Sequence, residues 1–161
     1  MIILDTDVVS NLRRKKPHPA LLRWIAEVGW DELRTTSFTV MEIQIGIERA
    51  RVSAPAVADE VSRWLRGLLD VGHLQVLGFG PEAAMLYARM HETPALRNFL
   101  STPQSSRKVK TGADLAIAAI AIAHDATVAT ANTGDFLEIH EHFPLPGLYN
   151  PLTEIWPLTE T

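Results

Sequence analysis

Hydrophobic positions along the chain follow two patterns that alternate with each other. Short aperiodic apolar runs, typical of strands buried on both faces, occur at residues 2–4, 33–36, 74–77 and 127–130. Between them, apolar residues recur every three or four positions, as in amphipathic helices. This spacing predicts helices over residues 8–12, 21–28, 37–50, 57–68, 81–90 and 112–124. A last strand is expected near Leu148.

Strands that alternate with helices predict βαβ units, and therefore an α/β fold with a mainly parallel sheet of four to five strands. A length of 161 residues with 47% hydrophobic and 21% charged residues fits one ordered domain. We expect the domain to cover residues 1–150 and a Pro-rich tail to cover 151–161. Parallel sheets place ligands beyond the carboxyl ends of their strands.

Four acidic residues stand where the chain leaves or re-enters that edge of the sheet. They are Asp5, Glu42, Asp114 and Asp135, the last with Asn132 three residues before it. Several carboxylates in one place repel each other unless protons or cations neutralise them. The chain has no cysteine, so the oxygen-rich set points to the hard ions Mg²⁺ or Mn²⁺.

Helix capping is the competing interpretation of each acid taken alone. Thr39 with Glu42 and Thr111 with Asp114 match the spacing of a capping box. Asp7 directly precedes the helix predicted over residues 8–12, so we assign it mainly to capping that helix. The metal interpretation requires the four acidic side chains to meet at one edge of the sheet, whereas helix caps need not lie near one another.

Two packing features bear on this convergence. Gly46 lies one turn after Glu42, where we expect it to let another backbone approach. The helix after residue 112 is rich in alanine, which allows it to lie close to the sheet and bring Asp114 near Asp5. Intrinsic helix propensity explains the alanines equally well.

Four segments of the chain together resemble the PIN-domain ribonucleases, especially the VapC-type toxins and their FitB subgroup. The first runs from Ile3 to Leu12, although the family usually carries Asn where Asp7 stands. The second is Thr39–Ile43 with Gly46, and the third begins at Asp114. The fourth covers residues 128–136, and residues 148–151 resemble the closing segment of the family. Each motif alone is weak, but they occur in the family order over almost the whole chain.

This resemblance implies a three-layer α/β/α fold and a Mg²⁺-dependent (or Mn²⁺-dependent) endoribonuclease that leaves a 5′-phosphate and a 3′-hydroxyl. It also implies a homodimer inhibited by a VapB/FitA-like antitoxin. Asp5, Glu42 and Asp114 would be metal ligands. We assign the fourth position to Asp135, with Thr130 and Asn132 as orienting neighbours and Asp7 adding charge behind the ligands.

The formal net charge of −4 means that any RNA contact must come from local basic runs or bound cations. Two runs flank the predicted site: Arg13, Arg14, Lys15 and Lys16, and then Arg107, Lys108 and Lys110. Solvated surface is the competing interpretation of both. His140 and His142 share a face only on a strand and lack a third ligand. Trp64, Leu65 and Leu68 are assigned to the core, with part of that helix face open to a partner.

Two other functions fit parts of the sequence. Residues 2–9 also resemble the first motif of haloacid-dehalogenase-type phosphatases, and Thr36 or Ser37 could imitate the second. That interpretation lacks a lysine motif and leaves Glu42 and Asp114 without a role. A PIN-like scaffold that binds RNA or protein without cutting is the other alternative. No signal peptide or membrane span is expected, because the longest apolar run, residues 115–123, falls short of the roughly 20 residues a bilayer requires. We therefore expect a cytoplasmic protein.

Overall fold

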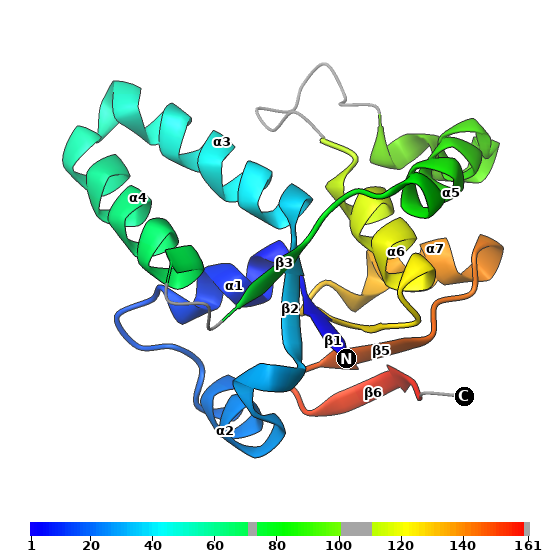
Figure 1. Ribbon diagram of the computed structural model, residues 1–161, viewed down its shortest axis with the longest axis horizontal. Coiled ribbons are helices and arrows are strands. Elements are labelled where there is room, and N and C mark those ends of the chain that lie inside the picture. Colours follow the sequence, from blue (N-terminus) through cyan, green and yellow to red (C-terminus); the bar gives the residue numbers. More distant parts are fainter. Residues whose placement is uncertain (71–73, 101–110, 160–161) are drawn as a thin grey trace.

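A twisted six-stranded sheet lies at the centre of the computed structural model, which describes residues 1–70, 74–100 and 111–159 (Figure 1). The strand order is β3-β2-β1-β4-β5-β6, and β1 to β5 are parallel. The strands are β1 (Ile2–Leu4), β2 (Leu33–Thr36), β3 (Gln75–Leu77), β4 (Thr127–Ala129), β5 (Gly147–Asn150) and β6 (Ile155–Leu158). The predicted α/β class and parallel sheet are confirmed.

The sixth strand is one more than the sequence predicts. β6 pairs antiparallel with β5 through an irregular register, and it lies inside the segment expected to be a tail. The sequence pattern does not predict this strand because it contains Pro157. Proline has no N–H for the hydrogen-bond ladder and occurs in sheets only at edges and bulges. Its position at the sheet edge is one that proline tolerates.

The helices predicted from the periodicity are all present, most with longer bounds than predicted, whereas α6 is one residue shorter at each end. They are α1 (Thr6–Leu12), α2 (Pro19–Val28), α3 (Ser37–Ser53), α4 (Pro55–Asp70), α5 (Pro81–Glu92), α6 (Ala113–Ala123) and α7 (Thr133–His142), with the 3₁₀ turns η1 (Trp30–Glu32) and η2 (Pro94–Phe99). Helix α7 is not among the helices predicted from the sequence, where residues 132–135 indicate only a turn after the strand at 127–130. Phe136 and Ile139 are buried three residues apart on the inner face of that helix.

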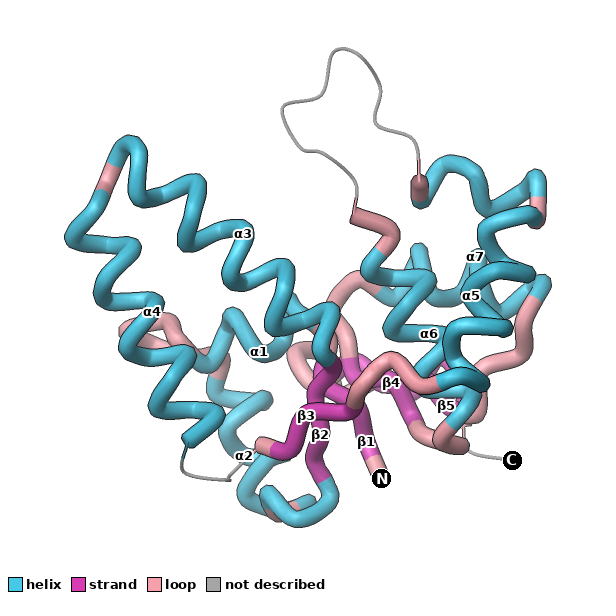
Figure 2. The backbone as a smooth tube through the Cα atoms, turned by 45° about the horizontal axis from the view of Figure 1, so that its top comes forward, coloured by secondary structure: helices cyan, strands magenta, loops and turns pink. Residues whose placement is uncertain are grey.

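Successive strand residues face two different cores, which makes the fold three-layered. Ile3, Val128 and Leu148 pack with residues of α5, α6 and α7. Their neighbours Leu4 and Ala129 pack with residues of α1 to α4 on the opposite face. Figure 2 shows α3 and α4 as a hairpin that extends beyond the sheet. The α/β/α arrangement implied by the family resemblance is therefore confirmed.

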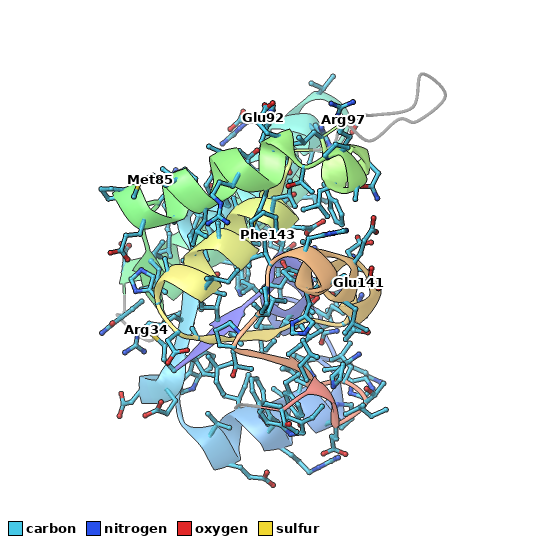
Figure 3. All side chains as sticks on the ribbon, turned by 90° about the vertical axis from the view of Figure 1, so that its right-hand side faces the viewer. Arg34, Met85, Glu92, Arg97, Glu141 and Phe143 are labelled. Atoms are coloured by element: carbon cyan, nitrogen blue, oxygen red, sulfur yellow. The ribbon has the colours of Figure 1, made fainter. Side chains whose placement is uncertain are left out.

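The face covered by α5, α6 and α7 holds the most completely buried helix. Eight of the 11 residues of α6 are buried, five of them alanines, and the helix lies between the sheet and its neighbours. Figure 3 views this side, where Arg89 of α5 stacks 5.6 Å from the centre of the Phe143 ring that follows α7. The small side chains allow the close packing that positions the start of α6.

The order of the strands reverses between β1 and β4. The chain builds outward from β1 to β2 and β3, then returns to place β4 and β5 on the other side of β1. Such a reversal opens a crevice at the carboxyl ends of the two strands, where α/β proteins bind ligands. Thr36, Asp5 and Thr130 mark the ends of β2, β1 and β4. In the described residues, no helix is both long and apolar enough to cross a membrane.

Candidate metal and nuclease site

A cleft of about 390 Å³ opens at this strand reversal. Its walls come from α1, α3, the start of α6 and the loop after β4. The lining residues are Asp5, Thr6, Asp7, Ser10, Glu42, Ile45, Gly46, Arg49, Thr111, Asp114 and Asn132. Three of the four acids singled out by the strand-end argument, Asp5, Glu42 and Asp114, therefore share one cavity, and the fourth carboxylate in it is Asp7 rather than Asp135.

Asp5 is the deepest of these carboxylates, with 4% of its surface exposed. Its Oδ1 accepts from the backbone N–H of Thr6 at 2.6 Å, and its Oδ2 accepts from the Thr130 hydroxyl at 2.8 Å. Burial raises the pKa of Asp5 to about 8, and the charges of Asp7 and Asp114 add to the rise. The fold therefore holds this group at a site where its charge needs a neutralising partner.

Asp7 does not cap the helix as predicted, because α1 begins at Thr6, two residues earlier than expected, with Asp5 as its N-cap. The Asp7 carboxylate instead reaches the loop after β4. Its Oδ2 accepts from the backbone N–H groups of Ala131 at 2.9 Å and Asn132 at 3.1 Å. Burial raises the pKa of Asp7, while these N–H groups oppose the rise. Asp7 thus ties the first and fourth motifs together, a contact across the sheet that no local spacing reveals.

Glu42 projects from α3 and is held by two threonine hydroxyls. Thr6 donates to its Oε2 and Thr111 donates to its Oε1, both at 2.7 Å. The expected capping box of Thr39 and Glu42 is absent, because α3 begins earlier and Thr36 caps it by accepting from the Thr39 N–H. Glu42 is consequently not tied to its own helix terminus and lies in the cleft.

Asp114 lies in the first turn of α6, and its charge contributes to the raised pKa of Asp5. The competing interpretation, a capping box of Thr111 and Asp114, is not observed, because the N-cap of α6 is Gly112, which has no side chain. Gly112 adopts a left-handed φ of 68°, and a Cβ there would lie 2.7 Å from the Tyr87 hydroxyl. Tight packing at this glycine fixes where α6 starts, and with it the position of Asp114.

At the fourth predicted acidic position, one residue lies in the cleft and a second contacts it from outside. Asn132 lines the cleft, whereas Asp135 does not. Asn132 donates through Nδ2 to Oδ2 of Asp135 at 2.6 Å, so the charged group stands directly behind the amide. The helix-capping alternative is not observed, because Asn132 is the N-cap of α7 but makes no side-chain capping bond. Thr130 is fully buried and donates to Asp5, in line with an orienting role.

The donor chemistry fits a hard divalent cation. Across residues 1–70, 74–100 and 111–159, no three carboxylates or histidines are gathered closely enough to hold one ion jointly. Mg²⁺ does not need such a cage, because proteins usually hold it through one or two carboxylates while it keeps several waters. Asp5 and Asp114, which interact electrostatically inside the cleft, are a pair of this kind.

Several lining residues were not identified from the sequence. Thr6 and Ser10 stand one turn apart on α1, inside the first motif, and Arg49 lies on α3 seven residues after Glu42. Helical periodicity could have found Arg49, because positions i, i+4 and i+7 share a face. The same face holds Gly46, where the predicted close backbone approach is wrong, since a Cβ there would meet nothing within 4 Å.

The remaining candidates lie around the cleft or away from it. Residues 13 to 16 are exposed, and Arg13 borders a groove that adjoins the cleft. Arg107, Lys108 and Lys110 lie outside the described residues. His140 and His142 belong to a helix, and the His140 ring accepts from the Leu145 N–H at 3.0 Å, which is a structural role.

The adjoining groove runs between α1, α3 and α4. Its wall includes Ile47, Ala50, Val57 and Trp64, so it is largely apolar. Leu65 is buried in the core as predicted, whereas Trp64 is half-buried and contributes to this surface.

Comparison with known proteins agrees with this geometry. The profile of the PIN domain family matches residues 2–141. The plasmid stability protein StbB of Pseudomonas syringae pv. tomato is 32% identical over 137 residues, covering 84% of this chain and 91% of that protein. The VapC ribonuclease Y4jK of Sinorhizobium fredii is 32% identical over 142 residues, covering 84% and 90%.

Solved structures show the same fold. The structure of FitAB bound to an IR36 DNA fragment contains a chain with a TM-score of 0.61 and 25% identity, covering 94% of this chain and 96% of that chain. The match to the PIN domain profile, residues 2–141, spans every element that lines the cleft.

Proposed function

The chain belongs to the PIN-domain family, and on this basis we propose that it is a Mg²⁺-dependent (or Mn²⁺-dependent) endoribonuclease, the toxin of a VapBC-type toxin–antitoxin pair. A relative that aligns with most of the chain is a VapC ribonuclease. The observation that carries the proposal is the convergence of Asp5, Glu42 and Asp114 on one cleft. A haloacid-dehalogenase-type phosphatase would leave Glu42 and Asp114 without a task in that same cleft.

Asp5 and Asp114 are the proposed holders of the ion. When bound, the ion supplies positive charge for the phosphate and for the attacking water. Glu42 positions or deprotonates that water, and the hydroxyls of Thr6 and Thr111 orient the Glu42 carboxylate for the task. Cleavage then leaves a 5′-phosphate and a 3′-hydroxyl.

The fourth acidic function is assigned to Asp135 acting with Asn132. Asn132 lines the cleft, and its amide is oriented by the Asp135 carboxylate. Asp7 holds the loop after β4 by accepting from the Ala131 N–H, and Thr130 orients Asp5 by donating to its carboxylate. Replacement of Asp135 by asparagine should therefore reduce cleavage less than the same change at Asp5.

The partners follow from the family. FitAB, of which one chain resembles this protein, is known bound to a DNA fragment, and by analogy we propose a VapB/FitA-like antitoxin for this chain. A homodimer is proposed on the same analogy, and light scattering of the purified protein tests it. RNA contacts are proposed for the exposed run Arg13, Arg14, Lys15 and Lys16, and for Arg107, Lys108 and Lys110.

Cleavage of a transfer-RNA and ribosomal-RNA pool by the purified chain tests the proposal. We expect cleavage with Mg²⁺, none with EDTA, and a loss of more than about 100-fold in Asp5→Asn and Asp114→Asn. Asp59→Asn is the matched control, because Asp59 is exposed, lies outside the cleft and only pairs with Arg51 at 3.5 Å. Undiminished cleavage by Asp5→Asn would overturn the assignment, and RNA binding without any cleavage would favour the scaffold function.

A further inference from the structure

The acidic cleft also contains a positively charged side chain, which belongs neither to the four sequence motifs nor to the two predicted basic runs. Arg49 lines the cleft from α3. The other charged residues that line the cleft, within the described part of the chain, are Asp5, Asp7, Glu42 and Asp114. An arginine among four carboxylates would ordinarily serve as their counter-ion.

Arg49 does not serve as a counter-ion in this arrangement. Its side chain is exposed, and no ion pair joins it to another described residue. The contrast with Arg51 on the same helix is direct, because Arg51 pairs with Glu48 at 3.2 Å and with Asp59 at 3.5 Å. Arg49 therefore keeps its guanidinium available to a ligand that enters the cleft.

The position of Arg49 along α3 determines what it can reach. It lies two turns after Glu42, or roughly 10 Å along the helix axis. Gly46 lies between them on the same face, and a Cβ there would meet nothing within 4 Å. Open space thus connects the carboxylates with the arginine across the bare surface of α3.

We propose that Arg49 binds a backbone phosphate of the RNA strand next to, but not at, the bond that is cut. This inference rests on the proposed ribonuclease function and names a substrate contact for it. An RNA strand that approaches four carboxylates is repelled, and a guanidinium at the rim offsets part of that repulsion. Arginine suits the task because its planar fork donates two parallel hydrogen bonds to a phosphate. The distance from Glu42 assigns Arg49 to a neighbouring phosphate, while Gly46 keeps the path over the helix clear.

The test measures RNA binding in the absence of cleavage. Binding of a fluorescent single-stranded RNA octamer is measured over a range of salt concentrations, in an Asp5→Asn background that prevents cutting. In that background we compare Arg49→Gln, Arg49→Lys and Arg51→Gln. We expect Arg49→Gln to weaken binding about tenfold and to reduce the salt slope by about 0.7, the value for one lost phosphate contact on a single strand. Arg49→Lys should restore the slope, because it keeps the charge, and Arg51→Gln should match the parent.

Two further arms separate this role from the alternatives. A dinucleotide too short to reach Arg49 should bind Arg49→Gln and the parent equally. In protein that carries the native Asp5, Arg49→Gln should leave Mn²⁺ affinity unchanged, whereas loss of a counter-ion would strengthen it. An unchanged salt slope in Arg49→Gln, or equal weakening in Arg51→Gln, overturns the inference. If the parent chain binds RNA through Arg49 but never cuts it, the inference stands and the ribonuclease proposal fails.

Discussion

The raised pKa of Asp5 makes the stability of the metal-free protein depend on pH in an unusual direction. Its pKa is about 8 in the folded chain and 3.8 in the unfolded chain. Below about pH 4 the group is protonated in both states and has no effect. Between about pH 4 and 8 the unfolded chain releases the proton while the folded chain retains it, so stability falls as pH rises.

The magnitude follows from the size of the pKa shift. Each pH unit in this window costs about 1.4 kcal/mol, which amounts to about 4 kcal/mol by pH 7. Asp5→Asn removes this cost because it cannot ionise. The variant should therefore be more stable than the parent by an amount that grows with pH, although it loses the proposed ligand.

Urea unfolding at several pH values in EDTA measures this difference directly. Titrating groups away from the cleft contribute to parent and variant alike, so the difference between the two curves reports Asp5 together with its electrostatic interaction with Asp7 and Asp114. Mg²⁺ should flatten the pH dependence of the parent, because a bound cation favours the ionised carboxylate, and leave the variant unaffected. Parallel curves for parent and variant from pH 5 to 8 would refute the electrostatic argument.

Three further predictions concern the supports of the site. Thr111→Val removes one of the two hydroxyl groups that donate to the Glu42 carboxylate, so it should lower kcat several-fold, and Thr111→Ser should restore kcat. An unchanged kcat in Thr111→Val would contradict this role of Thr111. Asp7→Ala leaves two loop N–H groups without their acceptor and should destabilise the protein by about 1–3 kcal/mol in thermal unfolding, with Asp7→Asn milder; an unchanged Tm would count against the contact. Gly112→Ala should cost more than about 1 kcal/mol, because its φ is positive and its Cβ would meet Tyr87, and a stabilised variant would show that the turn is less constrained.

The sequence predicts most of the fold because strands and helices leave different hydrophobic patterns in it. Buried parallel strands appear as aperiodic apolar runs, and helices appear with the period of 3.6, so the strands β1 to β4 were located nearly to the residue. Three carboxylates of the cleft, Asp5, Glu42 and Asp114, followed from topology, because carboxyl ends of parallel strands meet at one edge. This argument needs no knowledge of side-chain contacts.

What the sequence could not provide depends on contacts between distant segments. Asp7 looked like a cap because local spacing cannot reveal that its acceptors lie at Ala131 and Asn132. The capping box at Glu42 failed for a similar reason, since its partners are Thr6 and Thr111. In both cases a long-range hydrogen bond replaced the local one that the spacing suggested.

The hydrophobic pattern of the sequence also did not predict the edge strand β6. β6 contains Pro157 and pairs with an interrupted register, so it lacks the alternation that identifies strands. Arg49 escaped notice for a different reason. Helical spacing places it on the same face as Glu42 and Gly46, but its role depends on carboxylates of other segments that the fold brings to the same cleft.

Binding of Mn²⁺ to the purified chain, followed by electron paramagnetic resonance, tests most directly whether the cleft is a metal centre. The account predicts saturable binding that weakens at least about tenfold in Asp5→Asn and in Asp114→Asn, and that stays unchanged in Asp59→Asn. Equal Mn²⁺ affinity in the parent and in both cleft variants would contradict the central claim that these carboxylates hold the ion.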